Sequence, residues 1–195
     1  MALRIGVMSL QGAVEPHIKA LTECGARAER VRTPEETERL DGLILPGGES
    51  TTMGILMSRF GLMEAVQKRA AEGMPVYGAC AGMILMAKQI VDSEQPRLEL
   101  MDIRVRRNAY GRQVDSFEAP IEMPSLGGEP FPGVFIRAPF IESAEPHVRR
   151  LAELDGRPVL VQEGNLLASS FHPELTADRR IHRYFLQMSD NESGA

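Results

Sequence analysis

A cysteine between two glycines is the residue whose type and setting point most clearly to chemistry. The segment Gly78-Ala79-Cys80-Ala81-Gly82 follows one apolar run and precedes another, which predicts a turn between a strand and a helix. The glycines of such an elbow let strand and helix approach closely, and the helix N-terminus favours a thiolate. Cys80 is therefore a candidate nucleophile, with the backbone N–H of Ala81 as a donor to an oxyanion. The alternative is a small buried cysteine in a core turn.

A histidine and a glutamate at the end of a later apolar run can supply the base that a thiol nucleophile needs. Pro173 disfavours the helical region for His172, so the side chains of His172 and Glu174 can project to the same side of an extended segment. Glu174 can then orient the imidazole while His172 takes the thiol proton, in a Cys-His-Glu triad. An exposed turn histidine beside a capping glutamate is the alternative.

A glycine-rich loop, Pro46-Gly47-Gly48-Glu49-Ser50-Thr51-Thr52, separates a predicted strand from a predicted helix. Its glycines permit close backbone approach to a ligand, and Ser50 or Thr51 can cap the helix. No Gly-Lys-Ser/Thr sequence follows, so a phosphate-binding P-loop is not indicated. An ordinary capped turn is the alternative.

The remaining polar candidates carry weaker signals. Residues 104–113 are expected to form a solvated basic edge, from which one arginine can bind a substrate carboxylate through two hydrogen bonds. The histidines outside the His-Pro-Glu segment have no cysteine or carboxylate neighbours at metal-ligand spacing, so we expect surface or capping positions and no metal site. Cys24, near a helix end, is expected to be structural. The arginines are Arg106, Arg107 and Arg112, and the histidines are His17, His147 and His182.

Strands that alternate with helices must position these groups. The first half of the chain alternates short apolar runs with helical patterns, which predicts right-handed crossovers and a mostly parallel sheet covered by helices on both faces. Ligands of such sheets bind at the carboxyl ends of the strands. The expected strands are 3–10, 28–32, 42–45 and 74–79, and the expected helices are 14–24, a polar stretch after Pro34, and 50–71.

The second half carries short strands separated by glycine and proline, which predicts antiparallel additions beside the parallel core. The fold class is therefore α/β with three layers, in a single domain over residues 1–195. The chain is expected to close with a helix over 176–188 and a frayed tail over 189–195. The expected strands of this half are 102–107, 113–123, 133–137, 158–162 and 166–171.

Composition limits the class of protein. The 195 residues suit one domain, and a net charge of -5 argues against a general nucleic-acid surface. Two cysteines do not make a disulfide framework, so we expect reduced thiols and a cytoplasmic location. The apolar N-terminus is too short for a signal peptide, and no segment approaches the roughly 20 apolar residues of a membrane span. Membrane association is not expected.

Five blocks of sequence, in this order, closely resemble the glutaminase subunits of pyridoxal phosphate synthase, a family of class I glutamine amidotransferases with a flavodoxin-like fold. The resemblance runs from Ile5 to about Leu186. The cysteine elbow and His-Pro-Glu mark class I amidotransferases generally, whereas the other blocks point to this family. The blocks are 46–52 (PGGESTT), 78–82 (GACAG), 107–113 (RNAYGRQ), 134–139 (VFIRAP) and 171–176 (FHPELT).

The resemblance implies a role for each matching residue. Cys80 matches the family's nucleophile, His172 its general base, and Glu174 the residue that orients the base. The matching glutamine-binding positions are Gly48, Glu49, Ser50, Arg107, Ile136 and Arg137, and the expected oxyanion donors lie near Gly48 and Ala81.

The expected reaction is hydrolysis of L-glutamine to L-glutamate and ammonia through a thioester on Cys80. In the family, ammonia passes to a separate synthase subunit that builds pyridoxal phosphate from sugar phosphates, so this chain is expected to bind no cofactor itself. The similarity also suggests that docking on the synthase completes the oxyanion hole. The isolated subunit is then expected to be a poor glutaminase.

Other functions differ from this one in residues or partners. The glutaminase subunit of another amidotransferase would share the triad, and a cysteine hydrolase of similar fold would use the elbow without His-Pro-Glu. A flavodoxin-like binding module would need a Ser/Thr-rich loop after the first strand, and Ser9-Leu10-Gln11-Gly12-Ala13 supplies little of that. A degenerate regulatory subunit should have lost a triad member, and none is missing.

Overall fold

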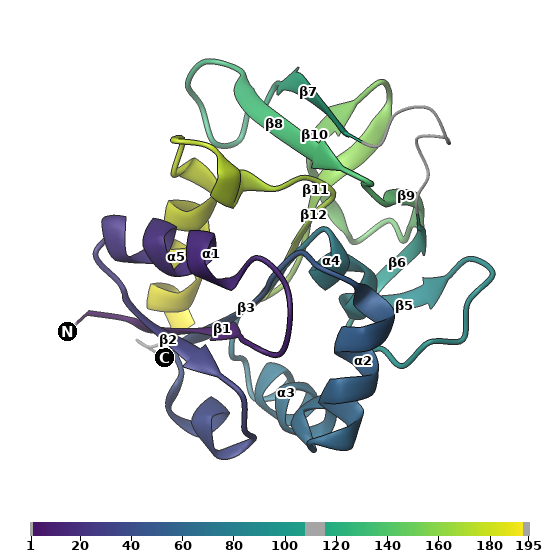
Figure 1. Ribbon diagram of the computed structural model, residues 1–195. Helices are drawn as coiled ribbons and strands as arrows, with labels where there is room; N and C mark the ends of the chain where they lie inside the picture. The colour runs from purple at the N-terminus through teal and green to yellow at the C-terminus, as the bar shows by residue number, and fades with distance from the viewer. Residues whose placement is uncertain (1, 108–115, 193–195) are drawn as a thin grey trace.

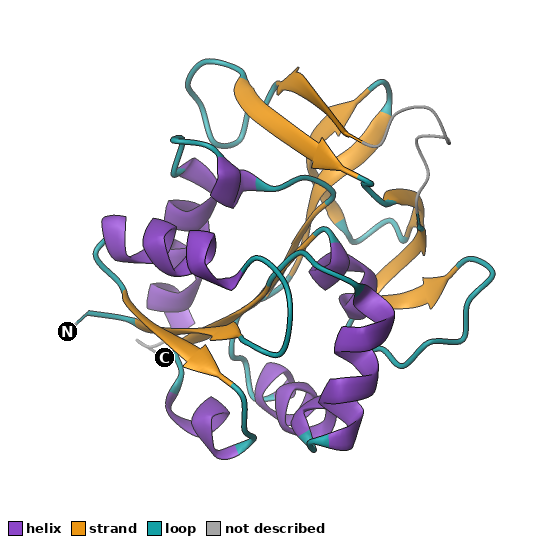
Figure 2. Ribbon diagram, viewed as in Figure 1, coloured by secondary structure: helices purple, strands orange, loops and turns teal. Residues whose placement is uncertain are grey.

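A seven-stranded sheet forms the centre of the protein, whose computed structural model describes residues 2–107 and 116–192 (Figures 1 and 2). Five adjacent strands are parallel, and two further strands extend one end of the sheet in antiparallel fashion. The expected mostly parallel sheet with antiparallel additions is confirmed. In spatial order the strands are β10 (Arg149–Leu154), β11 (Arg157–Glu163), β12 (Leu166–Ser169), β4 (Val76–Ala79), β3 (Gly42–Leu45), β1 (Arg4–Met8) and β2 (Arg27–Val31).

Helices cover both faces of this sheet, so the fold has three layers (Figure 1). Side chains alternate between the two faces along β3: Leu43 and Leu45 belong to one buried core, and Ile44 belongs to the other. Each face of the sheet therefore packs against its own set of helices. One face carries α1 (Val14–Glu23) and α5 (Arg180–Glu192), and the other carries α2 (Ser50–Arg59), α3 (Leu62–Ala71) and α4 (Ala81–Met86).

Two of the expected helices differ in extent. The helical pattern over 50–71 is two helices, because Gly61 adopts φ 71° and separates α2 from α3. The last helix begins later than expected, after the 3-10 helix η2 (Pro173–Leu175), and the Asp178 carboxylate accepts a hydrogen bond from the backbone N–H of Arg180 at its start. It then continues to Glu192, so residues 189–192 of the expected tail are helical. The polar stretch after Pro34 is a short 3-10 helix, η1 (Glu35–Arg39).

Two smaller sheets lie beside the main one (Figure 2). The sequence patterns do not predict β5 (Ala87–Ile90), β9 (Phe140–Ala144) or β10. No glycine or proline separates β5 from α4, and β10 pairs with β11 in an irregular register. The expected strand over 113–123 begins outside the described residues, and its described part contains β7. The smaller sheets consist of β5 (Ala87–Ile90), β6 (Met101–Arg106) and β9 (Phe140–Ala144), and of the pair β7 (Ser116–Ile121) and β8 (Phe131–Ile136).

The parallel strands β1, β3, β4 and β12 all end at one edge of the sheet. The helices that follow β1 and β3 lie on opposite faces, and a crevice opens where neighbouring connections diverge in this way. Hydrogen bonds tie the loops together there: the Ala13 N–H donates to the Gly47 carbonyl, and the Cys80 N–H donates to the Ser169 carbonyl. Within the described ranges, no helix has the length and apolar character that crossing a membrane requires.

Candidate active site

Cys80 occupies the turn between β4 and α4 with φ 51° and ψ −103°, a conformation that non-glycine residues rarely adopt. The glycines around it provide space. A Cβ on Gly78 would lie 2.5 Å from the carbonyl carbon of Gly82, and a Cβ on Gly82 would lie 2.1 Å from the carbonyl oxygen of Leu45. The expected elbow is therefore present, and only glycine at these two positions lets α4 lie this close to β3 and β4.

His172 and Glu174 are paired at the end of β12. The imidazole Nδ1 lies 2.7 Å from Glu174 Oε1, and both side chains are buried. The loop after β3 lies directly against the ring, because a Cβ on Gly47 would be 2.3 Å from His172 Cε1. The ring is thus held between a carboxylate and main chain.

The two acidic groups beside His172, Cys80 and Glu174, raise the pKa of its imidazole. Burial lowers this pKa, but hydrogen bonding to Cys80 and Glu174, together with the charges of both, raises it to about 10. Burial raises the pKa of Glu174, and the electrostatic attraction of His17 and the hydrogen bond from His172 bring it below its ordinary value. The site therefore stabilises an imidazolium beside an ionised carboxylate, which is the state reached when His172 has taken the thiol proton.

A cavity of about 420 Å³ lies in front of the Cys80 thiol. Every expected site residue except Glu174 lines this cavity, and Glu174 is only 4% exposed and contacts His172 from the buried side. The Cys80 Sγ also lies 3.8 Å from the Ile136 carbonyl oxygen at the end of β8. The residues brought together are Cys80, Ala81, His172, Gly48, Glu49, Ser50, Arg107, Ile136 and Arg137, and the lining also includes Gly12, Ala13, Gly47 and Ile84.

The two expected oxyanion donors, Gly48 and Ala81, both border the cavity. Ala81 is the first residue of α4, which begins without a side-chain cap. The N–H groups of a first helical turn have no partner within the helix, so they are available to an anion. Gly48 packs against the Gln11 side chain, because a Cβ there would lie 2.3 Å from Gln11 Oε1 and that amide would have to move.

Glu49 organises the glycine-rich loop. Its Oε1 accepts a hydrogen bond from the Thr51 N–H at 3.1 Å, and its Oε2 accepts one from the Thr52 N–H at 2.8 Å. Glu49, and not Ser50 or Thr51, therefore caps α2. The expectation of a Ser or Thr cap is wrong, because the longer carboxylate reaches both free N–H groups of the first turn.

Arg107 reaches the cavity from the segment after β6. Its Nη1 donates to Thr51 Oγ1 at 3.0 Å and to Gln95 Oε1 at 2.8 Å, and its Nη2 lies 3.5 Å from Glu49 Oε1. These contacts hold the guanidinium at the cavity as a site for a carboxylate. Arg106 instead pairs with Glu142 at 2.7 Å on the surface, as expected for a basic edge, whereas Arg112 lies outside the described residues.

The expectation that His17 and His182 lie at the surface is wrong. Both side chains are fully buried, and His17 Nδ1 lies 3.0 Å from His182 Nε2. The other ring nitrogen of His17, Nε2, lies 3.5 Å from Glu174 Oε2. The sequence carries no local signal of this pair, since α1 and α5 come from opposite ends of the chain.

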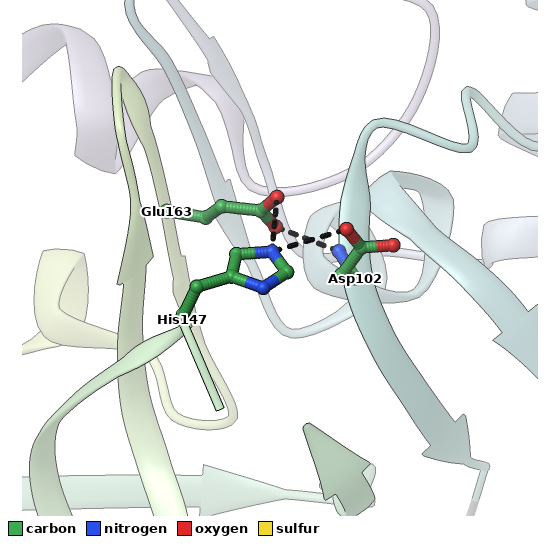
Figure 3. A group of neighbouring side chains, drawn as sticks. All are labelled: Asp102, His147 and Glu163. Carbon is green, nitrogen blue, oxygen red and sulfur yellow. Dashed lines mark hydrogen bonds and ion pairs between the residues drawn. The ribbon is translucent and has the colours of Figure 1, made fainter. Parts of the chain in front are cut away.

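His147 is at the surface, as expected, but its carboxylate neighbours come from distant segments (Figure 3). Its Nε2 lies 3.1 Å from both Asp102 Oδ2 and Glu163 Oε1. Within the described part of the chain, these three side chains are the one group with the spacing to hold a metal ion. Lys88 already pairs with Asp102 at 2.5 Å, and hydrogen bonding to Glu163 raises the pKa of His147, so the group forms an ion-pair network among its own side chains. It shares no residue with the cavity.

Sequence reasoning missed several residues that support the cavity. Gln11 accepts a hydrogen bond from the Glu49 N–H at 2.9 Å, and Gln95 accepts hydrogen bonds from Ser50 and Arg107. Gln11-Gly12 directly follows the first strand, so its place at a carboxyl strand end was the available signal. Gln95 lies in an irregular segment, and no pattern in the sequence identifies it.

Comparisons with known proteins show what the chain is similar to. The family model described as "SNO glutamine amidotransferase family" matches residues 7–191. A Moorella thermoacetica protein named pyridoxal 5'-phosphate synthase subunit PdxT is 54% identical over 186 residues, covering 95% of this chain and 99% of its own. A Dehalococcoides mccartyi protein of the same name is 56% identical, with 96% and 97% covered. A solved structure titled "Crystal structure of glutamine amidotransferase" superposes with a TM-score of 0.92 at 49% identity, covering 95% of this chain and 98% of that one.

Proposed function

The chain belongs to the SNO glutamine amidotransferase family, and from this premise we propose that it is the glutaminase subunit of a pyridoxal 5'-phosphate synthase. It hydrolyses L-glutamine to L-glutamate and ammonia, and the ammonia is used by a separate synthase subunit. The observation that carries the proposal is the Cys80 thiol at a 420 Å³ cavity, beside an imidazole whose Nδ1 lies 2.7 Å from the Glu174 carboxylate.

The Cys80 sulfur, whose proton has passed to His172, attacks the side-chain carbonyl carbon of glutamine. The resulting oxyanion is held by the backbone N–H groups near Gly48 and Ala81. When the carbon–nitrogen bond breaks, His172 returns its proton to the leaving nitrogen, and ammonia departs. Glu174 stays ionised and orients the imidazole throughout.

The second half of the reaction restores the thiol. A water molecule loses a proton to His172 and attacks the thioester carbonyl, and the carbon–sulfur bond breaks. The sulfur recovers its proton from His172, and the product leaves as a side-chain carboxylic acid that gives its proton to water and becomes glutamate. Because the sugar-derived chemistry belongs to the partner, the chain itself needs no cofactor. Its nucleophile must be a reduced thiol, and for that reason we place the chain in the cytoplasm.

Substrate recognition uses the groups that surround the thiol. The Arg107 guanidinium binds the α-carboxylate of glutamine, since it is already held in place by Thr51 and Gln95. Gly48, Glu49 and Ser50 contact the substrate from the loop after β3, and Ile136 and Arg137 contact it from the end of β8. The carboxamide then lies between Cys80 and the oxyanion donors.

The decisive experiment measures glutamate release from glutamine by the chain alone and with the pyridoxal 5'-phosphate synthase subunit of the same organism. We expect low activity alone, higher activity in the complex, and none with Cys80→Ala in either state. Cys24→Ala is the matched control, because Cys24 lies outside the cavity and its replacement should leave the rate unchanged. Full activity of Cys80→Ala would falsify the catalytic assignment. Copurification with a different amidotransferase partner would contradict the assignment to this synthase.

A further inference from the structure

Two buried histidines lie behind the carboxylate of the triad and have no part in the mechanism above. His17 comes from α1 and His182 from α5, and neither side chain is exposed. Glu174 uses Oε1 for His172, at 2.7 Å, and directs Oε2 at His17 Nε2, at 3.5 Å. Both Glu174 Oε2 and His17 Nε2 lack a hydrogen-bond partner within the described structure, so the 3.5 Å contact between them is the interaction open to each.

We propose that His17 is a positioning residue for Glu174, and that His182 fixes the tautomer of His17 that this role requires. The proposal rests on the function proposed above, because the residue that His17 positions orients the general base. It extends the set of interacting side chains from Cys80, His172 and Glu174 to a fourth and a fifth member.

The possible proton positions support this assignment. One hydrogen joins His17 Nδ1 and His182 Nε2, which are 3.0 Å apart. If His182 donates it, Nδ1 of a neutral His17 accepts, and the proton of His17 must be on Nε2, facing the Glu174 carboxylate. If His17 donates it, the lone pair of Nε2 faces the carboxylate oxygen across 3.5 Å, which is repulsive. The first arrangement is therefore the stable one, and it leaves His182 Nδ1 as a bare acceptor, in agreement with its lack of a partner.

The surroundings keep both imidazoles neutral. Burial lowers the pKa of His17, the charge of Glu174 raises it, and the charge of His172 lowers it again. Burial lowers the pKa of His182 well below its ordinary value, and His17 and Arg179 lower it further. The Tyr77 ring from β4 contacts both imidazoles edge-on, but its hydroxyl is bonded to Ser169 Oγ at 2.8 Å and does not compete for them.

In this arrangement the Glu174 carboxylate has a donor at each oxygen, His172 at Oε1 and His17 at Oε2. A neutral donor on Oε2 favours the ionised form of Glu174 without adding a charge that would repel the His172 imidazolium. If His17 is replaced by an apolar residue, Oε2 becomes a buried oxygen with no donor. Glu174 then binds a proton at a higher pH, and the orientation of His172 loosens.

The first test is kinetic and uses the complex with the synthase subunit. We expect His17→Leu to lower kcat by about 10- to 100-fold, as for other residues that orient a ligand or base, with little change in KM for glutamine. The acidic limb of the kcat–pH profile should move to higher pH. His17→Gln, whose amide can donate to Oε2, should recover part of kcat and move the acidic limb back toward its wild-type pH. His147→Gln is the control, since His147 is exposed and outside the cavity, and it should leave both unchanged.

A second measurement is independent of catalysis and of whether the variants fold. Nitrogen-15 NMR of the imidazoles in the full wild-type chain reports which ring nitrogens carry hydrogen. We expect the Nε2–H tautomer for both His17 and His182. An Nδ1–H tautomer of His17, or a folded His17→Leu variant with unchanged kcat and pH profile, overturns the proposal. If the complex has no glutaminase activity, the proposed function fails, and the NMR result still decides the tautomers.

Discussion

At the scale of single residues, the backbone of Cys80 gives a prediction about stability. A side chain at φ 51° and ψ −103° costs on the order of 1–3 kcal/mol, whereas glycine is free of this strain. Cys80→Gly should therefore be more stable than Cys80→Ala by about 1 kcal/mol, after the usual entropic cost of glycine. Urea unfolding of the two variants measures the difference. In Ala81→Gly, one residue later in a regular helix, glycine should instead destabilise by a similar amount.

The His147 network predicts a pH-dependent stability. Hydrogen bonding to Glu163 raises the pKa of His147, burial opposes this slightly, and the charges of Glu163 and Asp102 raise it further. A raised pKa means that the stabilisation is complete below the unfolded value of about 6.5 and is lost as the pH rises through the folded value. His147→Gln should therefore lower the Tm at pH 5.5 and have little effect at pH 9. Equal losses at both pH values, or a loss that salt does not reduce, would contradict this account.

The residues that the sequence predicts are those with a local signature. Cys80 lies between glycines that are required for space, and His172 and Glu174 are two residues apart, so each motif predicts its own geometry. Their convergence follows once the strands before them are placed in a parallel sheet. His17 has no such signature, because its contact with Glu174 joins segments at opposite ends of the chain. Contacts of this kind depend on the packing of α1 and α5, which no spacing encodes.

At the scale of secondary-structure elements, the contact between α4 and β3 predicts a severe effect of a small substitution. Gly82→Ala would place a Cβ 2.1 Å from the backbone oxygen of Leu45, and backbone cannot move aside as a side chain can. We expect a loss of more than about 2 kcal/mol in the free energy of unfolding, together with lower activity because Cys80 must shift. Chemical denaturation and the glutaminase assay measure the two effects.

Gly25→Ala provides the matched comparison for Gly82→Ala. Gly25 has φ 85°, but no atom lies within 4 Å of the position that a Cβ would take, so only backbone strain of about 1 kcal/mol is expected. Gly25 does not line the cavity, so activity should not change. If Gly82→Ala were no more destabilising than Gly25→Ala, the close approach of α4 to β3 would not be what requires glycine.

The sequence predicts where a helix or strand ends when the hydrophobic pattern and the turn residues indicate the same boundary. The strand over 42–45 matches β3, and the helix over 14–24 matches α1 to within a residue. The helical pattern over 50–71 continues across Gly61 because amphipathic spacing does not register a single left-handed residue. β10 has the sequence RRLAEL, whose residues favour a helix, and its pairing with β11 overrides that preference.

At the scale of the whole molecule, the structure predicts an uneven resistance to local opening. All residues of β3, β4 and β12 are buried, whereas β7 alternates between exposed and half-buried positions along most of its length. Amide hydrogens of these three central strands should therefore exchange with deuterium only through global unfolding, and those of β7 should exchange faster. Hydrogen-exchange mass spectrometry on the intact chain tests this. Equal protection of β7 and β4 would contradict it.

The whole-molecule architecture could be predicted because helices and strands alternate in the first half of the chain, and this alternation permits few arrangements. The smaller sheets could not be predicted in detail. β6 alternates along its length and matches the strand expected over 102–107, whereas β5 and β9 pair with it in irregular registers that no local pattern indicates. The same limit applies to the position of Ile136, whose carbonyl faces Cys80 only because β8 lies where it does.

The close contact between Gly47 and the His172 ring has a consequence for how such an enzyme can diversify. On this side of the imidazole the cavity is bordered by the main chain of Gly47, so neither natural variation nor a mutant library has a side chain to exchange there. Any replacement of Gly47 displaces the imidazole. New specificity must therefore enter through side chains elsewhere in the lining, such as those of Ile136 and Arg137 at the end of β8. The reacting groups and the adaptable groups are thus inherited on separate segments of the chain.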